Sequence, residues 1–210
     1  IIYHSIPDGE IDNRIKVKNN AVKSKLFNIA YAGSISNIMN LDAFLTMRRA
    51  LDLLPDYVRL TIYPITKVDL DSIGVSHRKI NQEIVNREEL KNRLNNADIV
   101  FAPLSHNSPN PDEILTVFSS KLLSYLVSGT PILVFGPKNC YHNICANKAG
   151  WGFVVEENSP EKLSEAIFKK LNKNFDSNKL VDNAFKEAEK RRASKAANKI
   201  LEWVKNDSMV

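Results

Sequence analysis

Two serines and a lysine stand where a short helix is predicted to begin, in the stretch FSSKLLSYLVSG that runs from Phe118 to Gly129. Ser119 or Ser120 can cap this helix by accepting a backbone N–H, and either hydroxyl can also donate to a ligand oxygen. Lys121 lies in the first turn, where the positive end of the helix dipole disfavours a cation unless an anion offsets both charges. The pattern therefore predicts an anion site, and phosphate is an anion that helix N-termini bind.

A second candidate for phosphate contact lies at the end of the first predicted strand, in AYAGSISNIMNLD. Gly33 lets a backbone approach a phosphate closely, but one glycine falls far short of the G-x-G-x-x-G pattern of dinucleotide-binding proteins. A plain turn explains Gly33 equally well. His106, just beyond the fourth strand, and the acidic pair Asp112 and Glu113 are further polar groups at this edge, and each also fits a solvated loop.

The elements that must position these residues are strands and helices in alternation. Apolar runs predict strands at residues 26–32, 58–63, 79–85, 99–102, 131–135 and 152–155, and helical periodicity predicts helices at 41–54, 87–95, 120–128, 141–148 and 160–171. Because most of these strands are apolar on both faces, we expect an α/β fold with a Rossmann-like, doubly wound parallel sheet. Ligands bind such sheets at the carboxyl ends of the strands.

A long basic helix is predicted from Asn183 to Asn206, with one apolar face and lysines mostly elsewhere. At about 1.5 Å per residue it would be about 36 Å long, which exceeds what one flank of this sheet covers. We therefore expect its apolar stripe to pack partly on this domain and partly on a neighbouring surface.

The composition, 43% hydrophobic and 25% charged over 210 residues, is that of a globular protein and excludes disordered and fibrous classes. No apolar run approaches the ~20 residues of a membrane span, and no cleavable leader is visible. Cys140 and Cys145, with His142 between them, have poor spacing for zinc, so we expect no metal. Residues 161–210 hold 12 Lys and Arg against 8 Asp and Glu. We expect a cytoplasmic protein that can touch an anionic membrane and has no nucleic-acid partner.

The ordered set of motifs is similar to a known family. NREELKNRLNNADIVFAPL, FSSKLLSYLVSGTPILVFG and AGWGFVVEENSPEKLSEAI resemble the C-terminal, nucleotide-sugar-binding domain of GT-B glycosyltransferases, in particular the group-1 (family 4) type. The likeness implies an interdomain junction at residues 1–25, a donor-binding domain at 26–172, and a C-terminal helix and tail at 173–210. It also implies that this chain is a fragment lacking an N-terminal acceptor domain, and that the donor is a nucleotide-diphosphate sugar with no further cofactor.

In that family, the loop after the first strand, the helix at SSKLL and the strand end near Val85 surround the diphosphate, ribose and base of the donor. The resemblance identifies no catalytic residue. It implies a donor site made of Gly33, Ser34, Val85, Asn86, Arg87, Thr116, Ser119, Ser120, Lys121 and Ser124.

The chain departs from the family at its charged positions. Two glutamates eight residues apart are replaced by Thr116 and Ser124, and the basic pair after the first glycine by Ser34 and Met39. A hydrogen bond to a charged group typically contributes about 1.5 to 3 kcal/mol, against about 1 kcal/mol for a neutral one. We therefore expect weak donor binding, with Lys121 as the obvious cation near the phosphates.

Three functions compete. The leading hypothesis is a glycosyltransferase donor domain that serves a glycan, lipid or protein acceptor and is inactive in isolation, because half of the active-site cleft is absent. A nucleotide-sugar epimerase with the same fold is the second, although this chain has few of the carboxylates and histidines that its cleft needs. The third is a degenerate binding or assembly domain without catalysis, which the lost glutamates and basic pair favour.

Overall fold

The computed structural model describes residues 4–13, 26–171 and 177–207. Its strands form one parallel sheet in the order β3-β2-β1-β4-β5-β6. The strands are β1 Phe27–Ala32, β2 Val58–Tyr63, β3 Ile80–Gln82, β4 Ile99–Pro103, β5 Ile132–Phe135 and β6 Gly152–Val155. This arrangement confirms the predicted Rossmann-like α/β fold.

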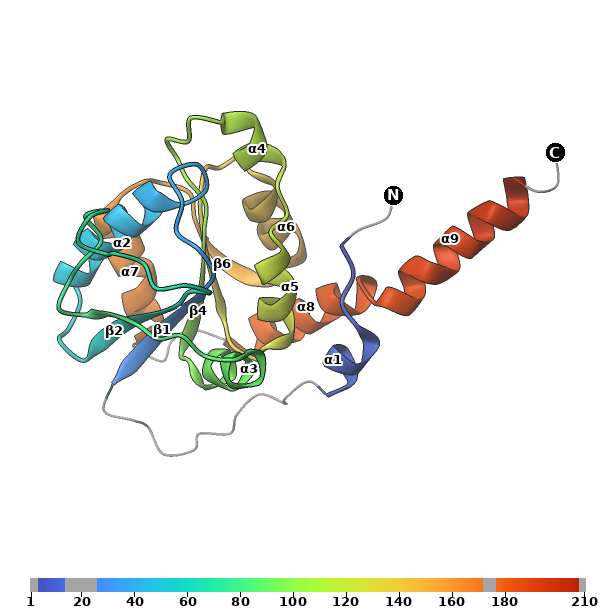
Figure 1. The fold of residues 1–210 in the computed structure, drawn as a ribbon, viewed down its shortest axis with the longest axis horizontal. Coiled ribbons are helices and arrows are strands. Elements are labelled where there is room, and N and C mark those ends of the chain that lie inside the picture. The colour runs from blue at the N-terminus through green and yellow to red at the C-terminus, as the bar shows by residue number, and fades with distance from the viewer. Residues whose placement is uncertain (1–3, 14–25, 172–176, 208–210) are drawn as a thin grey trace.

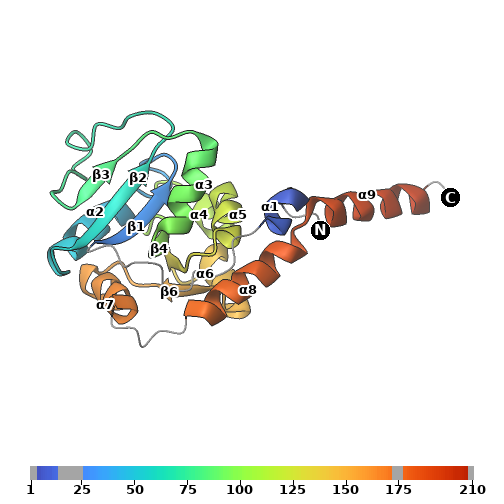
Figure 2. The ribbon, with the colours of Figure 1, turned by 90° about the horizontal axis from the view of Figure 1, so that it is seen from below.

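Helices cover both faces of the sheet, as Figures 1 and 2 show. Those on the domain itself are α2 Leu41–Asp52, α3 Arg87–Asn96, α4 Pro111–Thr116, α5 Ser120–Val127, α6 Tyr141–Ala149 and α7 Pro160–Leu171. One core lies between the sheet and the helices α2 and α7, and a second lies between the sheet and α3, α5, α6 and the later helix α8 (Ser177–Lys190). The two cores explain why the strand residues are apolar in both directions.

The chain leaves the two central strands toward opposite faces. β1 leads to α2 on one face, whereas β4, its neighbour in the sheet, leads through α4 to α5 on the other. The crevice between the carboxyl ends of β1 and β4 is therefore the topological switch point, where doubly wound sheets bind ligands. The start of α5 and the residue that follows β1 both lie at this point.

Three local predictions were wrong or incomplete. β3 spans only Ile80–Gln82 within the predicted 79–85. The acidic stretch expected as a loop forms α4, which begins at Pro111, a residue well suited to the first turn because its missing N–H would be unpaired there anyway. The segment predicted as a polar junction contains a short helix, α1 Asp8–Asp12, while residues 14–25 of that segment lie outside the described part of the chain.

The predicted single helix at the C-terminus is two helices, α8 and α9 (Ala193–Asp207), interrupted at Arg191 and Arg192. Ile6 pairs with the interruption: its N–H donates to the Arg191 carbonyl at 2.7 Å, and its carbonyl accepts from the Ala193 N–H at 2.9 Å. The contact from a distant segment takes two backbone groups out of the helical pattern, so helical periodicity along residues 183–206 did not reveal the break.

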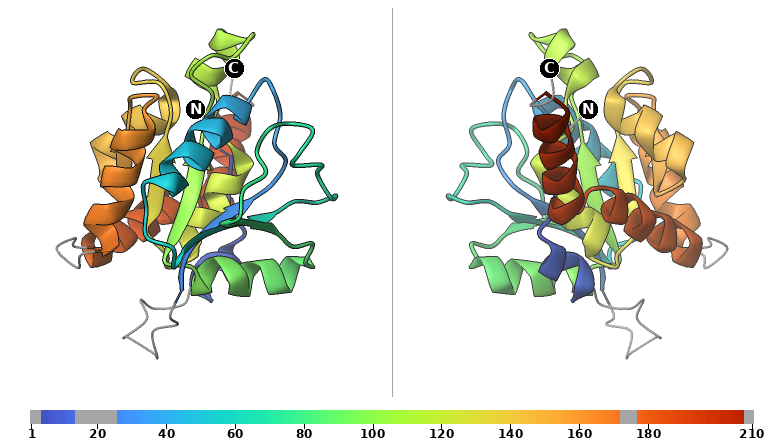
Figure 3. Two further views of the ribbon diagram at one scale, coloured as in Figure 1. Left: turned by 90° about the vertical axis from the view of Figure 1, so that its left-hand side faces the viewer. Right: turned by 90° about the vertical axis from the view of Figure 1, so that its right-hand side faces the viewer.

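The apolar stripe of this region is buried on one helix and exposed on the other. Val181, Ala184, Phe185 and Ala188 of α8 pack on the domain. α9 projects away from the body (Figures 1 and 2), and the right-hand view of Figure 3 faces the side from which it projects. Its side chains Ile200, Leu201, Trp203 and Val204 are 45%, 56%, 46% and 57% exposed. The prediction that the stripe packs only partly on this domain is confirmed for the described residues, and its packing on a neighbouring surface stays a prediction.

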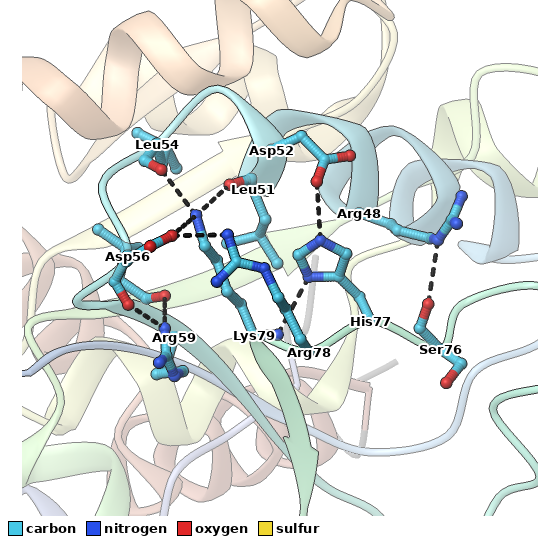
Figure 4. Close-up of polar contacts among 11 residues, drawn as sticks. Arg48, Leu51, Asp52, Leu54, Asp56, Arg59, Ser76, His77, Arg78 and Lys79 are labelled. Carbon is cyan, nitrogen blue, oxygen red and sulfur yellow. Dashed lines mark hydrogen bonds and ion pairs between the residues drawn. The ribbon is translucent and has the colours of Figure 1, made fainter.

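A buried lysine closes the C-terminal end of α2. Lys79, 1% exposed, donates to the carbonyls of Leu51 and Leu54 at 2.8 and 2.7 Å and lies 3.4 Å from Asp56 (Figure 4). A cation at a helix C-terminus satisfies carbonyls that have no partner within the helix and offsets the negative end of the dipole. This contact fixes the base of α2, at the opposite edge of the sheet from the candidate site.

Candidate functional site

The start of α5 is built differently from the predicted cap. Ser119 is the N-cap residue, but its hydroxyl makes no capping hydrogen bond. Its backbone N–H instead donates to Nε2 of His142, on α6, at 3.0 Å. The hydroxyl of Ser119 is therefore not committed to the helix, and Ser120 beside it is exposed.

Lys121 reaches across the carboxyl end of β1. It comes from α5 on one face of the sheet, and its Nζ donates at 2.7 Å to the hydroxyl of Tyr31, whose ring packs in the core on the other face. The ammonium also lies 4.8 Å from the centre of the Tyr31 ring. Lys121 therefore crosses from one helical layer to the other at the switch point.

Gly33 leaves room for this crossing. A Cβ on Gly33 would lie 3.1 Å from Nζ and 3.2 Å from Cε of Lys121, closer than most real Cβ contacts. The φ angle of Gly33 is also +128°, a backbone conformation that side chains disfavour. Gly33 was predicted either to contact a phosphate or to form a plain turn. The structure adds a steric reason for a glycine at this position, which the sequence did not show.

The electrostatics of the site are those of a cation among neutral groups. Burial lowers the pKa of Lys121 to about 8. Burial, and then the charge of Lys121, lowers the pKa of His142 to about 3, so this imidazole is neutral. Because Nε2 of His142 accepts a hydrogen bond, its proton is on Nδ1, which is buried and has no hydrogen-bond partner in the described structure. An anion is the ligand that such a site favours.

A pocket of about 90 Å³ lies between α3 and α5 and brings together two of the residues predicted for the donor site, Arg87 and Ser124. The Arg87 guanidinium forms an ion pair with Glu10 of α1 at 2.7 Å, across this pocket. Asn86 caps α3, since its Oδ1 accepts from the Glu89 N–H at 2.9 Å. Val85, half-buried, contributes to the core on this face and does not line the pocket.

Other candidates are engaged in local structure. Thr116, at the end of α4, donates to the Asp112 carbonyl at 2.8 Å and does not line the pocket with Ser124. Glu113 accepts from Asn110. His106 packs its ring on Phe135, contacts the Glu156 carbonyl at 3.2 Å, and has a pKa lowered by burial.

Ser34 contributes through its backbone, because its carbonyl accepts a hydrogen bond from Tyr31 at 2.6 Å. Tyr31, Asn40 and His142 are site residues that the sequence did not indicate. Tyr31 falls within a predicted apolar strand, Asn40 just precedes a predicted helix, and His142 was considered only as a zinc ligand. In the described ranges, His, Cys, Asp and Glu side chains form no cluster of three that could hold a metal ion. The arrangement can bind an anion and stabilise negative charge.

Sequence comparisons find no relatives: no protein-family model matches the chain, and neither does any curated protein. Similar solved structures do exist. HepE of Anabaena, solved with UDP-glucose, superposes on 86% of this chain with a TM-score of 0.65 and 12% identity, over 49% of its own length. WaaG, a glycosyltransferase of lipopolysaccharide biosynthesis, superposes on 80% with a TM-score of 0.56 and 17% identity, over 44% of its length.

A third similar structure is a single domain. The C-terminal domain of LpcC, a group-1 glycosyl transferase family protein from Francisella tularensis, superposes on 76% of this chain with a TM-score of 0.54 and 14% identity, over 83% of its length. At such identities the likeness shows the fold, which is that of the C-terminal half of a GT-B protein. The resemblance to GT-B glycosyltransferases that was predicted from the sequence is therefore confirmed for the fold. The chain spans less than half the length of WaaG.

Proposed function

We propose that this chain is the donor-binding half of a GT-B glycosyltransferase, which holds a nucleotide-diphosphate sugar while the sugar passes to a glycan, lipid or protein acceptor. One observation carries the proposal: the start of α5 and the Lys121 ammonium meet Gly33 at the switch point of a parallel sheet. Among the structures that share the fold, HepE is described in complex with UDP-glucose and with UDP and glucose, which supports a nucleotide-sugar ligand.

The contribution of the chain to transfer would be positioning and charge stabilisation. The leaving diphosphate gains negative charge as the glycosidic bond to it breaks, and preorganised donors around it lower that barrier. Here the donors are the N–H groups in the first turn of α5, the hydroxyls of Ser119 and Ser120, and Lys121. The pocket between α3 and α5, with Arg87 and Ser124, would take the nucleoside side of the donor. No further cofactor is needed for this role.

The acceptor would bind on a second domain of the same protein. The apolar face of α9 supports this, because its four large apolar side chains, Ile200, Leu201, Trp203 and Val204, are each 45% to 57% exposed. A domain that packs on α9 would bury that face. We therefore expect the chain alone to bind a donor without multiple turnover.

We propose a cytoplasmic location, as expected from the sequence. No helix in the described ranges is long and apolar enough to span a membrane. The lysines of α8 and α9 suit peripheral contact with an anionic surface, which a lipid acceptor would require.

A binding or assembly domain without catalysis is the second candidate. It is favoured by Thr116 and Ser124, which stand where the family that the chain resembles has glutamates, and by the separation of Thr116 from the pocket that Ser124 lines. Titration with nucleotide sugars separates the transferase from the assembly domain, because a transferase half binds a nucleotide sugar and an assembly domain does not need one.

Calorimetric titration with UDP-, GDP- and ADP-sugars tests the proposal. Lys121→Met should weaken binding of the preferred sugar nucleotide at least tenfold, since a charge-assisted hydrogen bond contributes about 1.5 to 3 kcal/mol. Lys148→Met, which removes an exposed lysine from the last turn of α6, is the matched control and should bind as the parent does. Ser124→Glu should strengthen binding of the nucleoside part. Failure of every sugar nucleotide to bind the parent would refute the proposed function.

A further inference from the structure

The hydroxyl of Tyr31 has a full set of hydrogen bonds. It accepts from Lys121 Nζ at 2.7 Å and from Asn40 Nδ2 at 2.8 Å, and it donates to the Ser34 carbonyl at 2.6 Å. A phenol has one proton to donate and two lone pairs, so all three are used. The ring is wholly buried and packs edge-on against Phe44, with centroids 4.7 Å apart. The position of the oxygen is therefore fixed by the core.

The same hydroxyl organises the loop between β1 and α2. Asn40, itself buried, accepts from the Ser36 N–H at 3.0 Å through Oδ1 and approaches the Ser34 carbonyl at 3.3 Å through Nδ2. The Ser36 hydroxyl accepts from the Met39 N–H at 3.1 Å. The loop is thus tied to Tyr31 at both of its ends, at Ser34 and at Asn40.

Lys121 has neutral neighbours at this place. The titratable groups that face it are Tyr31 from β1 and His142 from α6. Burial raises the pKa of Tyr31 above its usual range, so its hydroxyl stays protonated. Within the described residues no carboxylate forms an ion pair with Lys121, in contrast to Lys79, which lies near Asp56. The ammonium is therefore held in place by a neutral acceptor, and its charge is left for a ligand.

We propose that Tyr31 is a positioning residue of the diphosphate site: its hydroxyl fixes the Lys121 ammonium and the Ser34–Asn40 loop in one arrangement that receives the two phosphates together. The proposal rests on the proposed function of donor binding. This role accounts for the missing basic pair of the loop, because the cation comes from α5 and the Tyr31 hydroxyl holds it beside that loop. Tyr31 itself touches no substrate in this arrangement and acts through Lys121 and Ser34.

Tyr31→Phe tests this role, because it keeps the ring that packs on Phe44 and removes only the hydroxyl. Tyr125→Phe is the matched control: the Tyr125 hydroxyl is also buried and accepts from a backbone N–H of β1, that of Ala32 at 2.8 Å, but makes no hydrogen bond to Lys121. We would measure affinity for UDP-glucose by calorimetry. We would also measure the pKa of Lys121 from the ¹³Cε chemical shift in lysine-labelled protein, with the Lys121 signal assigned by its loss in Lys121→Met.

Tyr31→Phe should weaken UDP-glucose binding about tenfold and lower the Lys121 pKa by roughly one unit, because a desolvated ammonium loses its acceptor. A rise of that pKa toward 10.5, the ordinary value, would equally support the proposal, since it would mean that the freed side chain had moved into water. Tyr125→Phe should change neither quantity.

The two readouts separate this inference from the proposed function. If the parent binds UDP-glucose but Tyr31→Phe leaves affinity and the Lys121 pKa unchanged, the positioning role is refuted and donor binding stands. If the parent binds no nucleotide sugar, donor binding is refuted. The NMR titration still decides the case for Tyr31, since an unchanged pKa would show that its hydroxyl does not hold the lysine.

Discussion

Donor binding should take up a proton through Lys121. Burial lowers the pKa of this lysine to about 8 in the free protein, so about half of the molecules carry a neutral amine there at pH 8. A diphosphate beside Nζ favours the charged form and should restore the pKa toward its ordinary 10.5. Because the pKa rises on binding, affinity should be highest below pH 8 and should fall as the pH rises through it.

The size of the effect follows from the two pKa values. At pH 8 the free lysine is half protonated and the bound lysine almost fully so, which gives an uptake of about 0.5 proton per donor bound. At pH 7 the free lysine is already about 90% protonated, and the uptake falls to about 0.1 proton. Between pH 7 and pH 9 the affinity should drop about tenfold.

Calorimetry in pairs of buffers with different ionisation enthalpies measures this uptake directly. UDP-glucose suits the experiment, because its diphosphate is esterified at both ends and carries the same charge at pH 7 and pH 8. Lys121→Met should bind more weakly and take up no proton at either pH, whereas Lys148→Met should match the parent. Tight binding by the parent with no uptake at pH 8 would show that the phosphates do not reach Lys121.

Three further substitutions, one of them with a matched control, check the physical reasoning by chemical denaturation. Gly33→Ala should lower the free energy of unfolding by about 1 to 2 kcal/mol, because a positive φ angle strains a side chain. It should also weaken UDP binding, because the new Cβ would crowd Lys121. An unchanged affinity would contradict the claim that Gly33 leaves room for Lys121 to reach Tyr31. Lys79→Met should cost about 2 kcal/mol through two lost carbonyl contacts, while Arg78→Met, at an exposed ion pair, should unfold as the parent does. Trp203→Ser on α9 should leave unfolding unchanged, and a loss of stability would show that its face is packed within this chain.

The sequence predicted the sheet well because a strand that is buried on both faces appears as a continuous apolar run in the sequence. Each of the six strands lies within a predicted apolar run or extends it by one residue, and α4 is the one described helix between the strands that was not predicted. The predictions failed where a distant segment decides the local structure. The helix break at Arg191 and Arg192 depends on Ile6, about 185 residues earlier in the chain, and helical periodicity carries no trace of that contact.

The sequence indicated the charged residue of the candidate site, but not the residues that form hydrogen bonds with the site. Lys121 drew notice because a cation is unfavourable at the start of a helix, and the structure does place it beside Gly33. Tyr31 was indistinguishable from a core residue, since the pattern FNIAYA shows burial but not where a hydroxyl ends. Likewise, nothing in YHNICANKA indicates that His142 accepts the Ser119 N–H from a different helix.

The steric relation between Gly33 and Lys121 bears on why the basic pair of the loop is missing. A lysine on α5 reaches Tyr31 without crowding when residue 33 has no side chain. Once its ammonium is bonded to Tyr31 beside the Ser34–Asn40 loop, a second cation on that loop would repel it. Supplying the charge from the helix therefore disfavours supplying it from the loop. On this reasoning, Ser34→Arg should add no affinity for UDP-glucose in the parent but should recover part of the loss in Lys121→Met. Affinity gains of equal size in both backgrounds would mean that the two positions act independently, and that the loop lost its cations for a reason unrelated to Lys121.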